Sequence, residues 1–390
     1  MCCDGTWNYP DELAKGVAAP TNVAKVALGI ARHDAAELPQ RVYYQSGVGT
    51  RRFQRVRGGA FGYGLSRNVR ACYRFLVEIY EPGDELYFFG FSRGAYTARS
   101  TVGLIHNCGI LRPEHRDRLN EAYRLYKSGD DKKRPNAIAA KLFRRSYAYD
   151  SDDVKIHFVG VWDTVGALGI PIDGLPIPAF IKKTYGFHNT ELNTQVRNAY
   201  QALAIDEHRG PFKPAVWTRT EAQEGQVLQQ AWFAGAHRDV GGGEAEPALS
   251  EVPLMWMVNR ARDCGLVFKP RHFVEDPAPQ PAPAEPLARG LGEWVDPDPL
   301  GPCHPSLKGF YKMLPRNPRT LGQGRDPEIV GECAASSAVD RLPEYATPPG
   351  TGGLESDAYQ PANLIEWRKL HKAALDVLGD GELVDPWPPA

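Results

Sequence analysis

Short apolar runs alternate along most of the chain with stretches in which apolar residues recur every three or four positions. The runs are typical of strands buried on both faces, and the recurring spacing is typical of helices with one buried face. A first strand is expected to end at residue 3, and further strands are expected over 41–44, 86–89, 154–162 and 227–234. Helices are expected over 22–32, 65–80, 94–107, 194–207 and 362–378. This alternation predicts an open, mostly parallel α/β sheet with helices on both faces.

The pattern changes after residue 268, where proline and glycine become frequent and periodic segments become few. Residues 276–286 read DPAPQPAPAEP, and proline both fixes the backbone φ angle and lacks an N–H donor. This stretch is therefore expected to be an extended surface loop. We predict a catalytic core over residues 1–268 and a Pro/Gly-rich extension or lid over 269–390 that packs on the core.

Charge and composition narrow the range of partners. The 390 residues hold 46 Lys and Arg against 47 Asp and Glu, which leaves a formal net charge of −1. Such a balance gives no overall field that would recruit nucleic acid or an anionic membrane. We expect no nucleic-acid partner and at most transient membrane contact, while the oligomeric state is not indicated.

Cysteine usage and the apolar runs bear on the compartment and on cofactors. The seven cysteines are odd in number and form neither a disulfide framework nor a CxxC metal site, so no metal and no cofactor is expected. No apolar run approaches the roughly 20 residues that span a bilayer, and no signal-peptide pattern is visible. A cytoplasmic location is the resulting expectation.

The strongest chemical signal is a G-x-S-x-G sequence formed by Gly90, Ser92 and Gly94. It follows a predicted buried strand and precedes a predicted helix, which is the context of a nucleophile elbow. The tight turn holds the nucleophile in a strained conformation, and only small residues two positions before and after it avoid collision. Ser92 is therefore predicted to be a catalytic nucleophile, the alternative being a Gly-rich turn that only packs or binds an anion.

A serine nucleophile needs a histidine base, and in this type of site the histidine comes last in chain order. All ten histidines except His33 follow Ser92. His237 is favoured because it follows a predicted strand and has glycines on both sides. These glycines allow the backbone to bring the imidazole over the sheet edge. His157 is in the middle of a strand, and His106 ends the helix that Ser92 begins, so both are expected to be structural.

The acid that orients the base has three candidates. Asp163 follows the apolar strand 154–162 directly and would emerge at the same carboxyl edge of the sheet as Ser92. Asp206 is the alternative acid, although a position at a helix end beside Arg209 would suit an ion pair equally well. Asp239 is the weakest candidate and is expected to brace the glycine turn that follows it.

Two segments are candidates for the oxyanion hole. The amide of Arg93 begins the helix after the nucleophile, and Gly5 and Thr6 belong to the turn after the first strand. A simple Asx-type turn at this position is the alternative. The same DGT sequence is also typical of phosphatases that use D-x-D-G-T, but Cys2 stands where their nucleophilic aspartate would be, which disfavours phosphoryl transfer.

These motifs together resemble a known family. The chain is similar to uncharacterised α/β-hydrolase-like domains that include the catalytic domain of type VI secretion phospholipase effectors. The resemblance covers about residues 2–265 and, more weakly, 338–364. It is carried by CDGTWN (3–8), PTNV (20–23), SGVGT (46–50), GFSRGAYTAR (90–99), VGVWDTVG (159–166), DEHR (206–209) and GAHRDVGGG (235–243).

The resemblance implies a Ser-Asp-His esterase on an α/β-hydrolase-like fold. Ser92 matches the nucleophile and His237 the base, and Asp163 is our interpretation of the acid. The expected substrate is a small-molecule or lipid acyl ester, phospholipids among them, cleaved through an acyl-enzyme intermediate. A non-catalytic binding or scaffold protein on the same fold is the alternative, and only the hydrolase is expected to react with a fluorophosphonate probe.

Overall fold

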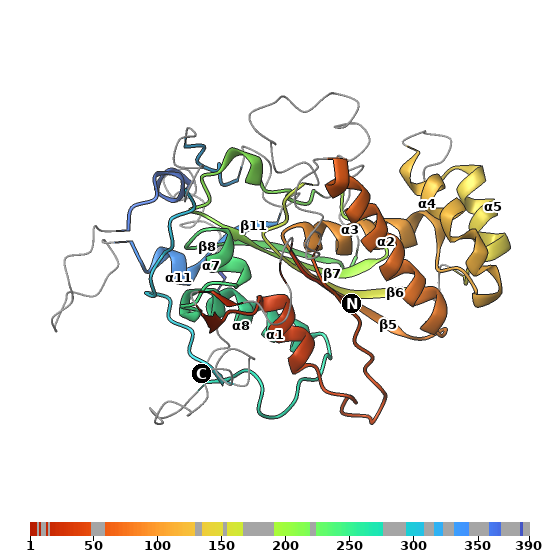
Figure 1. The fold of residues 1–390 in the computed structure, drawn as a ribbon, viewed down its shortest axis with the longest axis horizontal. Coiled ribbons are helices and arrows are strands. Elements are labelled where there is room, and N and C mark those ends of the chain that lie inside the picture. Colours follow the sequence, from red (N-terminus) through yellow and green to blue (C-terminus); the bar gives the residue numbers. More distant parts are fainter. Residues whose placement is uncertain are drawn as a thin grey trace.

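In the computed structural model, eight strands form one sheet through the middle of the molecule (Figure 1). Their order across the sheet is β12-β11-β8-β7-β6-β5-β1-β4, and every neighbouring pair is parallel. The strands are β1 (Cys2–Cys3), β4 (Tyr44–Gln45), β5 (Glu85–Phe91), β6 (Lys155–Trp162), β7 (Val196–Ala204), β8 (Val227–Phe233), β11 (Glu332–Ala335) and β12 (Leu383–Val384). The prediction of a mostly parallel α/β sheet is confirmed.

The structure describes residues 1–5, 8, 13–14, 16–47, 59–128, 135–150, 154–166, 191–218, 224–275, 294–307, 316–322, 331–342, 359–367 and 383–384. Within them the labelled α-helices are α1 (Asn22–Gly29), α2 (Gly59–Ile79), α3 (Arg93–Cys108), α4 (Leu119–Lys127), α5 (Ile138–Tyr147), α7 (His237–Gly241), α8 (Ala248–Asp263) and α11 (Ser336–Val339), and residues 362–367 are also helical. Short pairs are formed by β2 (Leu13–Ala14) with β3 (Val17–Ala18) and by β9 (Val274–Glu275) with β10 (Trp294–Val295).

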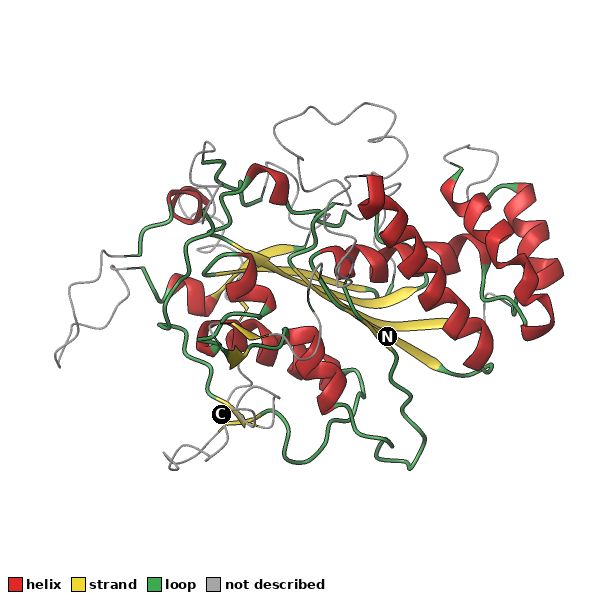
Figure 2. Cartoon of the chain, in the orientation of Figure 1, coloured by secondary structure: helices red, strands yellow, loops and turns green. Residues whose placement is uncertain are grey.

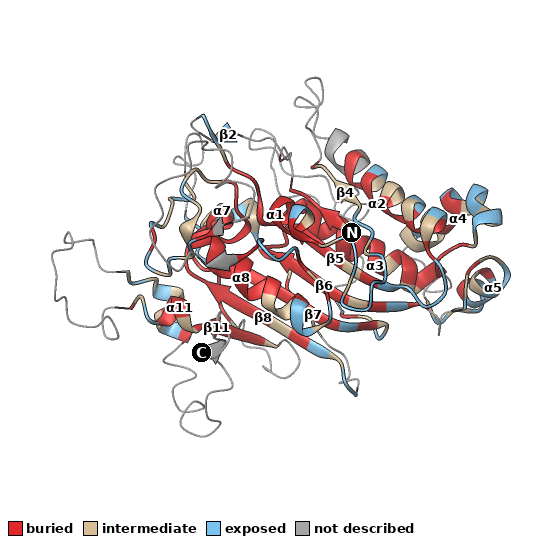
Figure 3. Cartoon of the chain, turned by 90° about the horizontal axis from the view of Figure 1, so that it is seen from below, coloured by how far each residue is buried: buried red, intermediate tan, exposed pale blue. Residues whose placement is uncertain are grey.

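Helices cover both faces of the sheet, as expected (Figure 2). The core on one face is built by α2 and α3 against Phe88 and its neighbours on the strands. The core on the other face is built by α1 and α8 against Phe89 and Phe91. Because successive strand residues point to opposite faces, the apolar run of β5 supplies both cores. Figure 3 shows that the strands are buried between these layers, whereas the outer surfaces of α4 and α5 are exposed.

The helix predicted over 194–207 is wrong, because this segment forms the central strand β7. Asn198 and Gln201 are polar residues three positions apart within this segment, and both side chains are buried. Asn198 donates to the His157 carbonyl on β6, and Gln201 donates to Gln230 on β8. Because these amide side chains are buried and bonded to neighbouring strands, their polar character does not mean that the positions face solvent.

The C-terminal segment takes part in the main sheet. Strand β11 pairs with β8 in the register Glu332 to Gln230, and α11 follows it directly. A third apolar cluster joins these elements to Leu364 and Trp367 of a helix over 362–367, where the described part of the helix expected over 362–378 ends. The Pro-rich residues 276–286 lie outside the described residues, and the boundary at residue 268 stays a prediction. No described helix is long and apolar enough to cross a membrane.

Candidate active site

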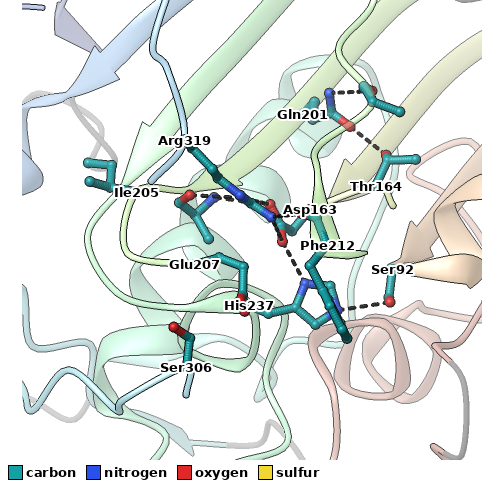
Figure 4. A network of polar contacts seen from close by, with 12 residues as sticks. Ser92, Asp163, Thr164, Gln201, Ile205, Glu207, Phe212, His237, Ser306 and Arg319 are labelled. Carbon is teal, nitrogen blue, oxygen red and sulfur yellow. Dashed lines mark hydrogen bonds and ion pairs between the residues drawn. The ribbon is translucent and has the colours of Figure 1, made fainter. Parts of the chain in front are cut away.

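Three parallel strands end at one edge of the sheet and are each followed by one candidate residue: Ser92 after β5, Asp163 after β6 and His237 after β8 (Figure 4). Ser92 Oγ lies 2.8 Å from His237 Nε2. His237 Nδ1 lies 2.5 Å from Asp163 Oδ2. The structure therefore joins the nucleophile, base and acid candidates in one continuous chain of hydrogen bonds.

The turn at Ser92 has the strained geometry expected of a nucleophile elbow. Ser92 adopts φ 57° and ψ −121°, a backbone conformation that non-glycine residues rarely occupy. A Cβ on Gly90 would lie 2.6 Å from Ala95 Cα, and one on Gly94 would lie 2.0 Å from the Cys3 carbonyl oxygen. Both contacts are with backbone that has no room to move, so both positions require glycine. The sterics that predicted the elbow are present in the structure.

His237 is held from several sides. It is the first residue of α7, after Gly235 with φ 96°. The ring centroids of Phe91 and Phe212 lie 4.6 and 5.0 Å from that of the imidazole. Asp239 braces the same turn, because its carboxylate accepts hydrogen bonds from the Ala236 amide and from His304. The imidazole consequently has little freedom to turn away from Ser92.

The protonation of His237 follows from its burial. Burial lowers the pKa of His237, since the charged imidazolium loses its hydration. The hydrogen bond and the charge of Asp163 act in the opposite direction, but the net pKa stays below the ordinary value. The imidazole is therefore neutral at neutral pH, which leaves Nε2 available as a proton acceptor.

Asp163 is fully buried and nevertheless ionised. Burial alone would raise its pKa, but the charge of Arg319 and the bond from His237 outweigh burial and hold the pKa below its usual range. Asp163 Oδ1 also accepts a hydrogen bond from the Ala204 amide at 3.1 Å. The backbone at Asp163 has φ 40°, a second left-handed conformation at this edge of the sheet.

The alternative acid, Asp206, follows strand β7 and does not end a helix as expected. Its Oδ2 accepts hydrogen bonds from the Gly235 amide at 2.7 Å and from Tyr359 Oη at 3.0 Å. Asp206 thus braces the turn that leads to His237, whereas Asp163 bonds the imidazole itself.

The structure describes two of the three oxyanion-hole candidates, Arg93 and Gly5. Arg93 is the first residue of α3 and directly follows Ser92, so its backbone amide belongs to the N-terminal end of that helix. Gly5 lies against Ser92, since a Cβ on it would be 3.3 Å from Ser92 Cβ. The Gly5 amide donates to Asp4 Oδ1 at 2.6 Å, so it would have to leave that bond to reach a substrate. Thr6 lies outside the described residues, and the roles of all three stay predictions.

Two features of the site were not found by sequence reasoning. Arg319 pairs with Asp163 from the far C-terminal segment, and no local motif marks it. Glu207 is buried and paired with Arg209, whose guanidinium lies 3.6 Å from the Phe212 ring centroid. Sequence reasoning offered Asp206 as the ion-pair partner of Arg209, but the guanidinium pairs with Glu207, and the link of this pair to the imidazole through Phe212 is visible only in the fold. Within the described ranges, no three His, Cys, Asp or Glu side chains form a group that would hold a metal ion.

A parallel sheet with helices on both faces and a strained G-x-S-x-G turn after strand β5 defines an α/β-hydrolase-like fold. Residues 1–260 match the family model of the type VI secretion phospholipase effector Tle1-like catalytic domain. The chain belongs to this family.

Three relatives show how the chain compares in extent. An uncharacterized protein of Saccharomyces cerevisiae, YEL023C, is 30% identical over 239 residues, which are 56% of this chain and 32% of that protein. A crystal structure of an uncharacterized protein from Pseudomonas aeruginosa is 17% identical with TM-score 0.39, covering 69% of this chain and 47% of the other. The Tle1 effector, in a structure bound to the VgrG spike of the type VI secretion system, is 20% identical with TM-score 0.32, covering 63% and 50%. The chain thus spans about a third of the yeast protein and half of each solved chain.

Proposed function

We propose that the chain is a serine esterase that cleaves carboxylic acyl esters, phospholipids among them, with Ser92, His237 and Asp163 as its catalytic triad. The observation that carries the proposal is the unbroken set of hydrogen bonds from Ser92 Oγ through His237 to Asp163. Membership in a phospholipase effector family favours a lipid ester as the substrate.

The first half-reaction forms the acyl-enzyme. Ser92 Oγ attacks the ester carbonyl carbon while its proton passes to His237 Nε2. Asp163 accepts the Nδ1 hydrogen of His237, which fixes the tautomer with a bare Nε2 and stabilises the imidazolium that forms. The carbon–oxygen bond to the alcohol then breaks, and the leaving alkoxide takes the proton from Nε2. For a phospholipid this step would release the lysophospholipid.

The second half-reaction regenerates the enzyme. A water molecule gives a proton to His237 Nε2 as its oxygen attacks the acyl carbon, and the bond to Ser92 Oγ breaks as that oxygen regains the proton. The product is the carboxylic acid. In both steps the negative charge on the carbonyl oxygen needs fixed donors, a role we assign to the Arg93 amide together with the turn at residues 5–6.

The test is reaction with a fluorophosphonate probe combined with turnover of short p-nitrophenyl esters and of detergent-dispersed phospholipid. We expect Ser92→Ala to abolish labelling and to lower kcat by about 10⁴ to 10⁶, with little change in thermal midpoint, because the hydroxyl serves chemistry more than packing. The matched control is Ser128→Ala, at the exposed end of α4, which should label and turn over as the wild type does. Full turnover by purified Ser92→Ala would end the serine-hydrolase proposal.

A further inference from the structure

We propose that Arg319 is a positioning residue of the triad, one that fixes the carboxylate of Asp163 and thereby sets the basicity of His237. This inference rests on the proposed function, because it assigns a role within the same site. Arg319 comes from residues 316–322, well beyond the part of the chain that matches the family model.

The guanidinium of Arg319 donates hydrogen bonds to both carboxylate oxygens of Asp163 (Figure 4). Arg319 Nη1 donates to Asp163 Oδ1 at 2.5 Å, and Nη2 donates to Oδ2 at 2.9 Å. The arginine side chain is 3% exposed and that of Asp163 is 0% exposed. A buried, bidentate pair fixes orientation as well as distance, because the planar fork matches only one rotation of the carboxylate.

The arginine is itself held by backbone carbonyls. Nη1 also donates to the Ala204 carbonyl at 2.8 Å, and Nη2 donates to the Phe212 carbonyl at 2.6 Å. The first carbonyl ends strand β7, and the second belongs to the turn whose phenyl ring packs against His237. Arg319 therefore ties the proposed acid to two neighbouring elements of the site, and four donated hydrogen bonds hold its guanidinium in place.

The charge of Arg319 has a second effect. Asp163 Oδ2 is shared between His237 Nδ1 and Arg319 Nη2, so the arginine partly neutralises the carboxylate that the imidazole faces. A partly neutralised carboxylate stabilises imidazolium less, and the arginine charge itself also opposes protonation of the imidazole. The groups facing His237 include Glu207, which favours protonation, and Arg209, which opposes it. Removal of the Arg319 charge should therefore raise the pKa of His237.

A purely structural arginine would give a different result. A buried pair that only joined the C-terminal segment to the core would affect stability, and the surviving folded protein would keep its rate and pH profile. The matched control is Arg341, in the same C-terminal segment, which donates to the carbonyls of Pro299 and Gly301 and to no member of the triad.

The experiment compares Arg319→Met, Arg319→Lys and Arg341→Met with the wild type. The rate is expressed per active site titrated with fluorophosphonate, which removes the contribution of unfolded protein. We expect Arg319→Met to lower kcat about 10- to 100-fold, the order of loss seen when a supporting group is removed and geometry relaxes. The acid limb of its pH–rate profile should move to higher pH, because the positive charge that opposes protonation of the imidazole is gone. Arg319→Lys should keep the acid limb near its wild-type pH but lower kcat. Lysine retains the positive charge but lacks the planar guanidinium that donates to both carboxylate oxygens.

A second readout does not depend on turnover. The pKa of His237 is measured in histidine-labelled protein from the ¹³Cε1 chemical shift, with His237→Gln used to assign the signal. A raised pKa in Arg319→Met supports the role of Arg319 even in a protein that cleaves no ester, and in that case only the proposed function fails. An unchanged His237 pKa and an unchanged rate per titrated site in Arg319→Met would overturn the inference. If Arg319→Met does not fold, Arg319→Lys decides: a wild-type rate per site would overturn the inference equally.

Discussion

Replacement of Asp163 by asparagine removes the charge of the proposed acid but keeps its shape, and the structure indicates how the amide would be placed. One carboxylate oxygen, Oδ1, accepts from the Ala204 amide and from Arg319 Nη1. The other, Oδ2, accepts from His237 and from Arg319 Nη2. An amide nitrogen at the first position would face two donors that are unable to turn away. At the second position it would face one, because the imidazole can change tautomer and accept.

The asparagine should therefore place its nitrogen toward His237. The imidazole then accepts at Nδ1 and carries its hydrogen on Nε2, which points at Ser92 Oγ and is no longer a base. A wrong tautomer of this kind lowers kcat by about 10⁴, which corresponds to about 5.4 kcal/mol in the activation free energy. The loss should appear in kcat rather than in KM, since ground-state substrate binding does not involve the proton on Nε2.

The assay is steady-state turnover of a short p-nitrophenyl ester by Asp163→Asn, per mole of folded protein. Asp206→Asn is the matched control, because this carboxylate accepts from the Gly235 amide and Tyr359 instead of the imidazole. It should lower the thermal midpoint and keep kcat within about tenfold. If Asp163→Asn kept kcat within tenfold while Asp206→Asn lost about 10⁴, the acid would be Asp206 and the reasoning from contacts would be wrong.

Two further predictions follow from the protonation and the packing of the site. Burial lowers the pKa of His237, so the acid limb of the kcat/KM profile should have its midpoint below about 6.5, the ordinary histidine value, and a midpoint above 7 would contradict a neutral buried base. Gly94→Ala should reduce the free energy of unfolding by about 1–3 kcal/mol and slow fluorophosphonate labelling, because its Cβ would meet the Cys3 carbonyl. The control is Gly166→Ala, whose Cβ would have nothing within 4 Å. Denaturant titration and labelling should show no change in that control.

The features that could be predicted from sequence are those whose cause is local. The apolar run of β5 reports a strand buried on both faces, and the tight turn after it can be formed only by small residues at positions 90 and 94. Both facts are contained in ten consecutive residues. The same holds for Asp163, because a residue that directly follows a buried parallel strand must emerge at the carboxyl edge of the sheet.

Strand β7 was assigned wrongly because its polar residues are satisfied by partners far along the chain. Gln201 bonds Thr164, Gln230 and the Ala215 carbonyl, and no spacing rule contains this information. Arg319 is beyond prediction for the same reason. Its neighbours in sequence are Pro318 and Thr320, and only the folded chain brings its guanidinium to Asp163.

The pairing of β11 with β8 also constrains the order in which the sheet can be completed. Cys333 Sγ contacts the Gln230 backbone carbonyl across 103 positions of sequence, and the Gln230 backbone N–H donates to the Gly331 carbonyl. Until that distant segment arrives, β8 presents an open edge of backbone donors and acceptors, the kind of edge that promotes association between chains. Closure of so long a loop costs entropy before the pairing stabilises anything, which makes it a late event in folding. Because β8 leads directly to His237, an edge of the sheet that closes late is the edge that carries the proposed base.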